Sequence, residues 1–115
     1  MTFFALSSGP GVSGIAVVRI SGKKTSKVIE LLTGKSVPKP RVATLRKINK
    51  INTSELIDEG IILWFPGPES YTGEDMAEFH IHGSKAVIDA LHHSISKVEN
   101  CRLAEAGEFT KLAFQ

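Results

Sequence analysis

The stretch "MAEFHIHGSKAVIDALHHSISKV", residues 76–98, predicts a strand that leads directly into a helix. The predicted strand is "MAEFHIH", residues 76–82, and Gly83 follows it, because glycine tolerates the backbone angles of a tight turn. The helix begins at Ser84 and carries its apolar residues at the spacing of one buried face, namely Val87, Leu91, Ile95 and Val98. His92 and His93 are expected near the solvent edge of this helix. A strand and a helix in succession indicate a sheet with helices packed against it.

The strand carries the densest group of polar side chains in the sequence. Alternate residues of a strand share a face, so Glu78, His80 and His82 lie together while Phe79 and Ile81 face the core. Three interpretations remain open: a metal site, a pocket wall that hydrogen-bonds a polar ligand, and a solvated strand face. A metal site lacks a fourth ligand, and we expect no metal here.

Two further features suit an anionic ligand. The junction of Gly83 and Ser84 offers the free N–H groups and the positive dipole end of a helix start. Arg19 lies in the apolar strand "IAVVRI", residues 15–20, so its guanidinium needs a partner. That partner is either a structural acid or the carboxylate of a ligand, which suits the planar fork of arginine.

The glycines of "GPGVSGIAVVRISG", residues 9–22, match G-x-G-x-x-G at Gly9, Gly11 and Gly14. A dinucleotide site requires a helix after the glycines, and here a strand follows. A P-loop requires Lys and Ser/Thr after its second glycine, but both positions after Gly14 are apolar. We therefore expect no nucleotide site in this segment.

The rest of the chain fits the same class of domain. We predict further strands over 2–8, 14–20, 42–48 and 55–65, helices over 21–34 and from 108 onward, a hairpin connection at 49–54 and a Pro/Gly loop at 66–75. In the first helix Ser21 is the predicted N-terminal cap and Gly34 the C-terminal cap. The fold class is α+β, with a mixed, mostly antiparallel sheet of about five strands and two to three helices.

Composition limits the chain to one domain of 115 residues, with the 42% apolar content of a folded core. No apolar run approaches the length of a membrane span, and the amino terminus lacks the basic region of a signal peptide. The lone Cys101 cannot form an internal disulfide, so a cytoplasmic location is expected. The last helical pattern runs to Gln115 without a cap, which suggests a fragment of a longer protein.

Charge is unevenly distributed although the net charge is only +2. Residues 1–53 carry ten Lys/Arg and one acid, a balance of +9, whereas residues 54–115 carry four Lys/Arg and eleven acids, a balance of −7. The asymmetry indicates a nucleic-acid face, a complementary self-contact, or charges that interleave and are solvated. No basic tract exceeds a pair and no set of stacking aromatics accompanies it, which favours the third interpretation.

Four segments together resemble one family: residues 9–22, "LWFPGPESYTGED" at 63–75, "AEFHIHG" at 77–83 and "AGEFTKLAF" at 106–114. They occur in this order and at this spacing in the N-terminal domain of the MnmE (TrmE) GTPases, which modify the wobble uridine of tRNA.

The resemblance implies that residues 1–115 form a folate-binding and dimerisation domain, similar to the folate-binding domain of aminomethyltransferases. It implies 5-formyl-tetrahydrofolate or a related tetrahydrofolate as ligand and a homodimer as assembly. For the full-length family it further implies GTP, magnesium and potassium as cofactors, with the flavoprotein MnmG and tRNA as partners and no membrane.

By the same resemblance Arg19 and Glu78 match folate-contacting positions, and the Glu78 carboxylate can accept the paired N–H groups of a pterin. The full candidate set for cofactor binding is Arg19, Glu78, His80, His82, Gly83, Ser84, Gly11 and Gly14, with the two opening glycines allowing close backbone approach. The chain departs from the family pattern at Ser84, Ala106 and Leu112, and a folate-contacting lysine of the family falls past residue 115.

Two alternatives stay open. One is a stand-alone folate-dependent one-carbon transferase that uses Glu78 or Asp75 as a base, and the other is a purely structural dimerisation domain. The sequence holds no G-x4-G-K-[ST] and no C-terminal cysteine motif, so we expect no catalytic residue for GTP hydrolysis in this chain. Cys101 does not match the cysteine of the family.

Overall fold

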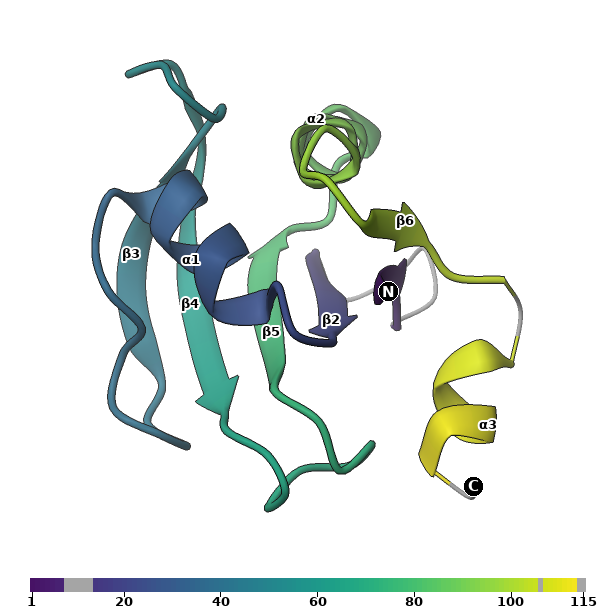
Figure 1. The fold of residues 1–115 in the computed structure, drawn as a ribbon. Helices are drawn as coiled ribbons and strands as arrows, with labels where there is room; N and C mark the ends of the chain where they lie inside the picture. Colours follow the sequence, from purple (N-terminus) through teal and green to yellow (C-terminus); the bar gives the residue numbers. More distant parts are fainter. Residues whose placement is uncertain (8–13, 106, 114–115) are drawn as a thin grey trace.

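A computed structural model describes residues 1–7, 14–105 and 107–113 of the chain. Its strands and helices (Figure 1) follow one another in the order β1 (Thr2–Leu6), β2 (Ile15–Ser21), α1 (Thr25–Thr33), β3 (Thr44–Asn49), β4 (Leu56–Phe65), β5 (Met76–His82), α2 (Lys85–Ser96), β6 (Cys101–Leu103) and α3 (Glu108–Ala113). Among the described residues, no helix has the length and apolar character needed to cross a bilayer.

The strands form one sheet in the order β3-β4-β5-β2-β1-β6. All neighbouring pairs are antiparallel except β1 and β6, which are parallel. The predicted α+β class with a mixed, mostly antiparallel sheet is therefore confirmed. The sheet has six strands in the described structure rather than about five, because the three-residue strand Cys101–Leu103 is too short to leave a sequence pattern.

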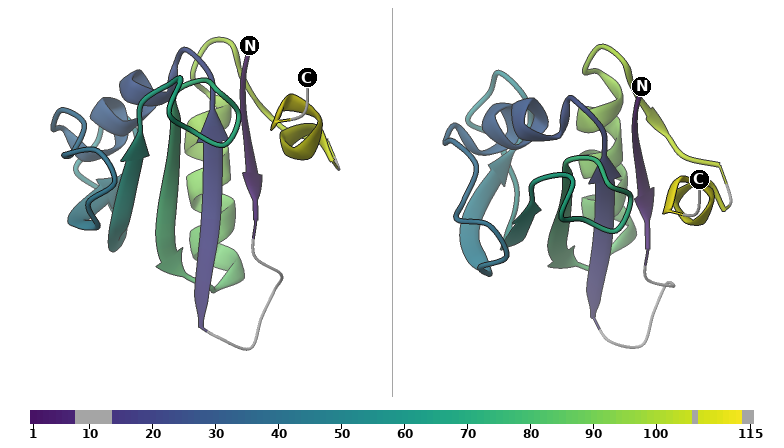
Figure 2. Two further views of the ribbon diagram at one scale, coloured as in Figure 1. Left: turned by 90° about the horizontal axis from the view of Figure 1, so that it is seen from below. Right: turned by 60° about the horizontal axis from the view of Figure 1, so that its bottom comes forward.

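One face of the sheet holds the core, and α1 and α2 pack against it. Figure 2 shows α2 running along the strands behind the sheet, while α3 stands apart from the strands on the side of β1 and β6. The largest fully buried side chains come from the core face of the strands and from these two helices, among them Phe4, Phe79, Ile20, Ile62, Ile29, Leu32, Leu91 and Ile95. The opposite face of the sheet is not covered by α1 or α2.

The start of α1 differs from the prediction. Ser21 is not its cap but the last residue of β2, where it is buried. The helix begins at Thr25 with Lys24 as N-cap, and no side chain caps its free N–H groups. Its end is as predicted, because Gly34 adopts φ 70° and its N–H donates to the carbonyl of Glu30.

The helix α2 follows the predicted pattern with one correction. Ser84 is its N-cap and accepts a 3.2 Å hydrogen bond from the N–H of Val87. The predicted apolar stripe faces the sheet. His92, however, does not lie at the solvent edge: it is half-buried, with its ring centroid 5.4 Å from that of Phe4. Only His93 is exposed, as predicted.

Candidate functional site

The face of the sheet that α1 and α2 leave open gathers the polar residues predicted from β2 and β5. Antiparallel register places Arg19 of β2 directly opposite Glu78 of β5, with Leu63 of β4 on the other side of Glu78. Two residues further along β5, His80 lies between Val17 of β2 and Ile61 of β4. The polar group is thus flanked by apolar side chains on both neighbouring strands.

Arg19 and Glu78 form an ion pair, and His80 completes a chain of three groups. The Nε of Arg19 donates to Oε2 of Glu78 at 2.9 Å, and Nε2 of His80 lies 2.9 Å from Oε1. The side chain of Arg19 is 40% exposed and that of Glu78 only 17% exposed. Arg19 therefore does not lie in the core as its apolar neighbours suggested, because it alternates onto the open face. Its Nη atoms make no hydrogen bond to any residue that the structure describes.

The carboxyl group of Glu78 is held in its charged form. Burial raises the pKa of Glu78, but hydrogen bonds from His80 and Arg19, together with the charges of both, lower it by more. The net pKa lies below the usual value of 4.5. At neutral pH the site therefore presents an ionised carboxylate, which accepts hydrogen bonds and donates none.

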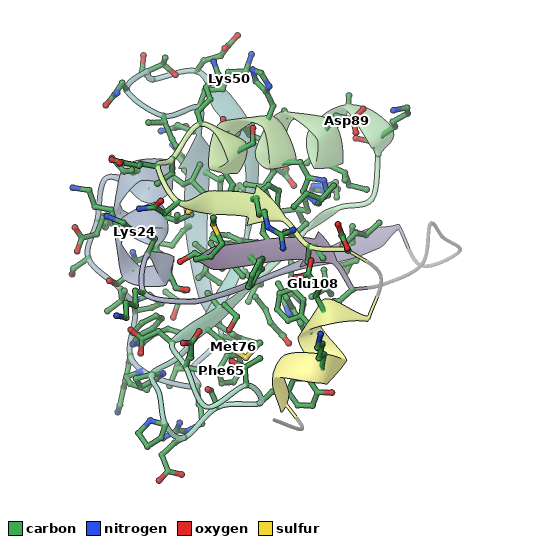
Figure 3. All side chains as sticks on the ribbon, turned by 45° about the vertical axis from the view of Figure 1, so that its right-hand side comes forward. Lys24, Lys50, Phe65, Met76, Asp89 and Glu108 are labelled. Carbon is green, nitrogen blue, oxygen red and sulfur yellow. The ribbon has the colours of Figure 1, made fainter. Side chains whose placement is uncertain are left out.

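A cavity of about 390 Å³ opens beside this ion pair, lined by Arg19, Glu78, Phe65, Met76 and Tyr71. We call it the Glu78 cavity. Phe65 and Met76 are register partners on β4 and β5 and lie side by side near the end of the sheet (Figure 3). Tyr71 comes from the loop 66–75 and is exposed. Apolar walls around one carboxylate and one guanidinium are typical of a small-molecule site.

The loop that carries Tyr71 is held by side chains of its own and of the sheet. The N–H of Gly67 donates to Oδ1 of Asp75 at 2.9 Å. The hydroxyls of Ser21 and Thr72 are 2.7 Å apart, which ties the loop to β2. These bonds fix the loop beside the Glu78 cavity.

A second cavity, of about 550 Å³, shares Arg19 with the first. It lies beyond the β1 edge, where Ala5, His92, Glu105 and Phe109 contribute to its wall. Nε2 of His92 is buried and has no hydrogen-bond partner among the described residues. Arg19 therefore stands between two cavities, each within the volume range of small-molecule sites.

His82 shares a face with Glu78 and His80, as predicted, but has a different partner. Its Nδ1 lies 2.9 Å from both carboxylate oxygens of Asp58, and its backbone N–H donates to Oδ2 at 2.8 Å. Burial raises the pKa of Asp58, but the hydrogen bonds from His82 outweigh burial and hold the pKa below its usual value. His82 is thus bound to β4 and does not line the Glu78 cavity.

The predicted anion junction lies at the other end of β5. Gly83 is five residues beyond Glu78, about 16 Å along an extended strand. Its N–H donates to the carbonyl of Gly14 at 2.9 Å, and Gly14 has φ 71°. The hydroxyl of Ser84 caps α2. An anion at this junction stays a prediction, and Gly11 lies outside the described residues.

No group of three His, Cys, Asp or Glu side chains within the described residues is arranged to hold a metal ion. His82 is bound to Asp58, which leaves only Glu78 and His80 adjacent on this face. Two donors do not make the closed ligand set of a structural site.

Several site residues carried no assigned role in the sequence analysis: Phe65, Tyr71, Met76, Asp58 and the buried nitrogen of His92. A tyrosine inside a Pro/Gly loop next to the polar strand is a signal that could have identified Tyr71. The register of β4 against β5 was needed to find Phe65, Met76 and Asp58, and the packing of α2 against Phe4 was needed to find His92.

Comparison with known proteins identifies the family of the chain. A family model described as the GTP-binding protein TrmE N-terminus matches residues 2–115. The chain belongs to this family. The TrmE N-terminal match leaves only Met1 outside it.

Curated relatives carry the same domain. A tRNA modification GTPase MnmE of Pelagibacter ubique (strain HTCC1062) is 84% identical over 115 residues, which are 100% of this chain and 26% of that protein. The mitochondrial 5-taurinomethyluridine-[tRNA] synthase subunit GTPB3 of Danio rerio is 51% identical over 113 residues, 98% of this chain and 22% of that protein. An MnmE of Brucella anthropi is 53% identical over 113 residues, 98% of this chain and 25% of that protein. The TrmE N-terminal domain described here spans about a quarter of the length of these relatives.

Proposed function

We propose that this TrmE N-terminal domain binds a tetrahydrofolate, with 5-formyl-tetrahydrofolate as the first candidate, and supplies a one-carbon unit to a tRNA modification. The relatives support the setting, because their descriptions are of a tRNA modification GTPase and of a 5-taurinomethyluridine-[tRNA] synthase subunit. The proposal for the whole protein also includes GTP with its magnesium and potassium, MnmG and tRNA. No residue of this chain is assigned to them.

The observation that carries the proposal is the ionised carboxylate of Glu78 at the wall of an apolar cavity. A pterin ring presents an N–H and an exocyclic amine side by side, and one carboxylate accepts both. The planar ring can lie against Phe65 and Tyr71, since flat aromatic surfaces stack favourably. Ligand contact would replace part of the interaction that Glu78 now makes with Arg19 and His80.

Arg19 suits the remainder of a folate. The Nη atoms without a partner among the described residues can bind a carboxylate bidentately. Arg19 also borders the second cavity, so a ligand of folate length can extend from Glu78 past Arg19 towards Phe109. This arrangement assigns the ring to Glu78 and the anionic tail to the Arg19 side.

Calorimetric titration with 5-formyl-tetrahydrofolate tests the proposal. Glu78→Gln keeps the shape of the side chain but loses the charge and one acceptor, so we expect at least about a tenfold loss of affinity. Glu30→Gln, at an exposed position on α1, is the matched control and should bind like the parent chain. Equal affinity in all three proteins would refute the assignment of the pterin to Glu78.

We further propose that a second copy of the chain covers part of the open face. Ile15 and Leu45 are 54% and 60% exposed, and their register partners His82 and Ile61 place them on that face. Exposed apolar side chains on a sheet face not covered by α1 or α2 favour self-association. Light scattering should show a dimer that Leu45→Glu weakens. A monomer at all concentrations would remove this part of the proposal without affecting folate binding.

The stand-alone transferase is less well supported. Asp75 does not line the Glu78 cavity, and the lowered pKa of Glu78 makes its carboxylate a weak base. Dimerisation without folate affinity would favour the purely structural domain. Turnover of 5-formyl-tetrahydrofolate by this chain alone would favour the transferase.

A further inference from the structure

A third cavity, of about 520 Å³, lies between the start of α1, the end of α2 and the turn that joins β3 to β4. Its wall combines three lysines, Lys24, Lys27 and Lys97, with three apolar side chains, Leu31, Ile51 and Val98. We call it the lysine cavity. It is separate from the Glu78 cavity, since the two share no lining residue, and Figure 3 places Lys24 well apart from Phe65 and Met76.

The three lysines carry charges without partners. Within the described residues, none of Lys24, Lys27 and Lys97 forms an ion pair. Lys50 on the neighbouring turn differs, because its Nζ lies 2.8 Å from Glu55. Glu99 also lines the cavity, so its lining holds three positive groups and one negative group. This balance leaves a surplus of positive charge in a concave site, where a bound anion is screened less by water.

The first turn of α1 adds to this field. Lys24 is its N-cap and its side chain makes no capping hydrogen bond, although the N–H of Lys24 donates to Oγ1 of Thr2 and that of Thr25 to the carbonyl of Gly22. The first turn holds no acidic residue. The N–H groups at this helix start and its positive dipole end are therefore not offset by a local carboxylate. The lysines and the helix dipole both attract an anion that binds in the lysine cavity.

Positive charge extends beyond the lysine cavity over the neighbouring surface. Residues 23–50 hold nine Lys/Arg and one acid, Glu30. Lys35, Arg46 and Lys47 border a further cavity of about 380 Å³ beside β3, together with Glu59. The two cavities share no lining residue, so a ligand that contacts both must be longer than a single small anion. The fold thus places three basic residues beside each cavity, although basic residues occur in the sequence only singly or in pairs.

We propose that the lysine cavity binds phosphate groups of an RNA strand, with the apolar side chains Leu31, Ile51 and Val98 contacting a base or ribose. An RNA strand carries a negative charge at each phosphate, and these charges attract lysines that form no ion pair among the described residues. The apolar wall favours a nucleotide over a bare ion, since bases bury apolar surface against protein. The choice of RNA rather than DNA rests on the proposed function.

Fluorescence anisotropy with a labelled single-stranded RNA and a series of salt concentrations tests the proposal. The site variant replaces Lys27 and Lys97 by glutamine, and the control variant replaces Lys85 and Lys111, which removes the same charge elsewhere. We expect the site variant to lose about tenfold in affinity at low salt and its salt slope to fall by about 1.4, since each single-strand phosphate contact contributes about 0.7. The control variant should keep the parent affinity and slope.

Three results would overturn the proposal: no RNA binding by the parent chain, equal losses in site and control variants, or displacement of RNA by adenosine monophosphate as efficiently as by unlabelled RNA. The third would identify a site for a free phosphate ester. Titration of the parent chain with 5-formyl-tetrahydrofolate separates the two proposals. Folate binding without RNA binding by the parent refutes the RNA site alone, whereas RNA binding without folate binding by the parent refutes the folate site alone.

Discussion

Arg19 and Glu78 lie directly opposite each other on β2 and β5, joined by a 2.9 Å hydrogen bond from Nε to Oε2. The two residues that we propose for folate binding therefore contact each other directly. Nε2 of His80, on the same strand as Glu78, lies 2.9 Å from the other carboxylate oxygen. These contacts restrict the three side chains, which lowers the cost of fixing them on binding.

The first prediction concerns the pKa of Glu78. Replacing Arg19 by Met removes one hydrogen bond and one positive charge, while burial of the carboxyl remains. The pKa of Glu78 should therefore rise, because burial favours the neutral acid once the opposing interactions weaken. A pH titration of the side-chain carboxyl carbon of Glu78 by NMR measures this directly.

His80→Leu should raise the same pKa, since His80 is the strongest of the interactions that lower it. Lys23→Met serves as the charge-matched control, because Lys23 is exposed and forms no ion pair with any described residue. A Glu78 titration that is identical in Arg19→Met and in the parent chain would show that the ion pair does not persist in solution.

The second prediction concerns His92 and acid sensitivity. Burial lowers the pKa of His92 below its ordinary value of 6.5, only partly offset by the charge of Asp89. The unfolded chain then binds more protons than the folded chain below about pH 6.5, so stability falls as the pH is lowered through this range. His92→Phe removes that dependence, and it should add about 1 kcal/mol at pH 8 by removing a buried nitrogen that has no hydrogen-bond partner among the described residues.

Urea unfolding at several pH values between about 8 and about 5 measures the effect, because an ordinary histidine titrates within this range. Asp89→Asn should instead increase the loss of stability at low pH, because losing that charge lowers the pKa of His92 further. Parallel pH profiles for His92→Phe and the parent would mean that His92 is solvated and protonates without cost.

The third prediction concerns the link between β4 and β5 at Asp58. Asp58→Ala removes the acceptor of the His82 backbone N–H and of its ring, which should cost about 1–3 kcal/mol at neutral pH. Because the folded pKa of Asp58 lies below its usual 3.8, this contribution is present above that value and is lost as the pH falls through the folded pKa. Glu59→Ala, at the exposed neighbour, is the control. Chemical denaturation at neutral and acid pH checks both, and equal stability of the two variants at neutral pH would contradict the role of Asp58.

The sequence was sufficient where local pattern alone determines structure. The alternation in residues 76–82 predicted β5 with the bounds that the structure has, and it placed Glu78 and His80 on one face. The end of α1 at Gly34 followed from the positive φ that glycine accepts. The resemblance to a family was confirmed over nearly the whole chain.

The sequence was insufficient where a residue depends on a distant neighbour. Ser21 has the chemistry of a helix cap, but pairing with β5 extends β2 through it and moves the helix start to Thr25. His92 borders the apolar stripe of α2, and only the position of that helix over Phe4 decides that it is covered. The partnership of Asp58 with His82 likewise requires the register of two strands.

The last prediction concerns Gly60, which allows β4 to approach β5 beside the site. A Cβ at this position would lie 2.3 Å from the carbonyl oxygen of His80, and that oxygen belongs to backbone and cannot rotate away. Gly60→Ala must therefore separate the two strands next to His80, and we expect a loss of stability of about 1–3 kcal/mol. Gly73→Ala is the matched control: its φ of 80° adds strain, but no atom lies within 4 Å of the new Cβ, so it should cost about 1 kcal/mol. Urea unfolding gives both values. If Gly60→Ala proves no more damaging than Gly73→Ala, the strands beside His80 are more loosely paired than the register indicates, and the preordered Arg19–Glu78–His80 group loses its structural support.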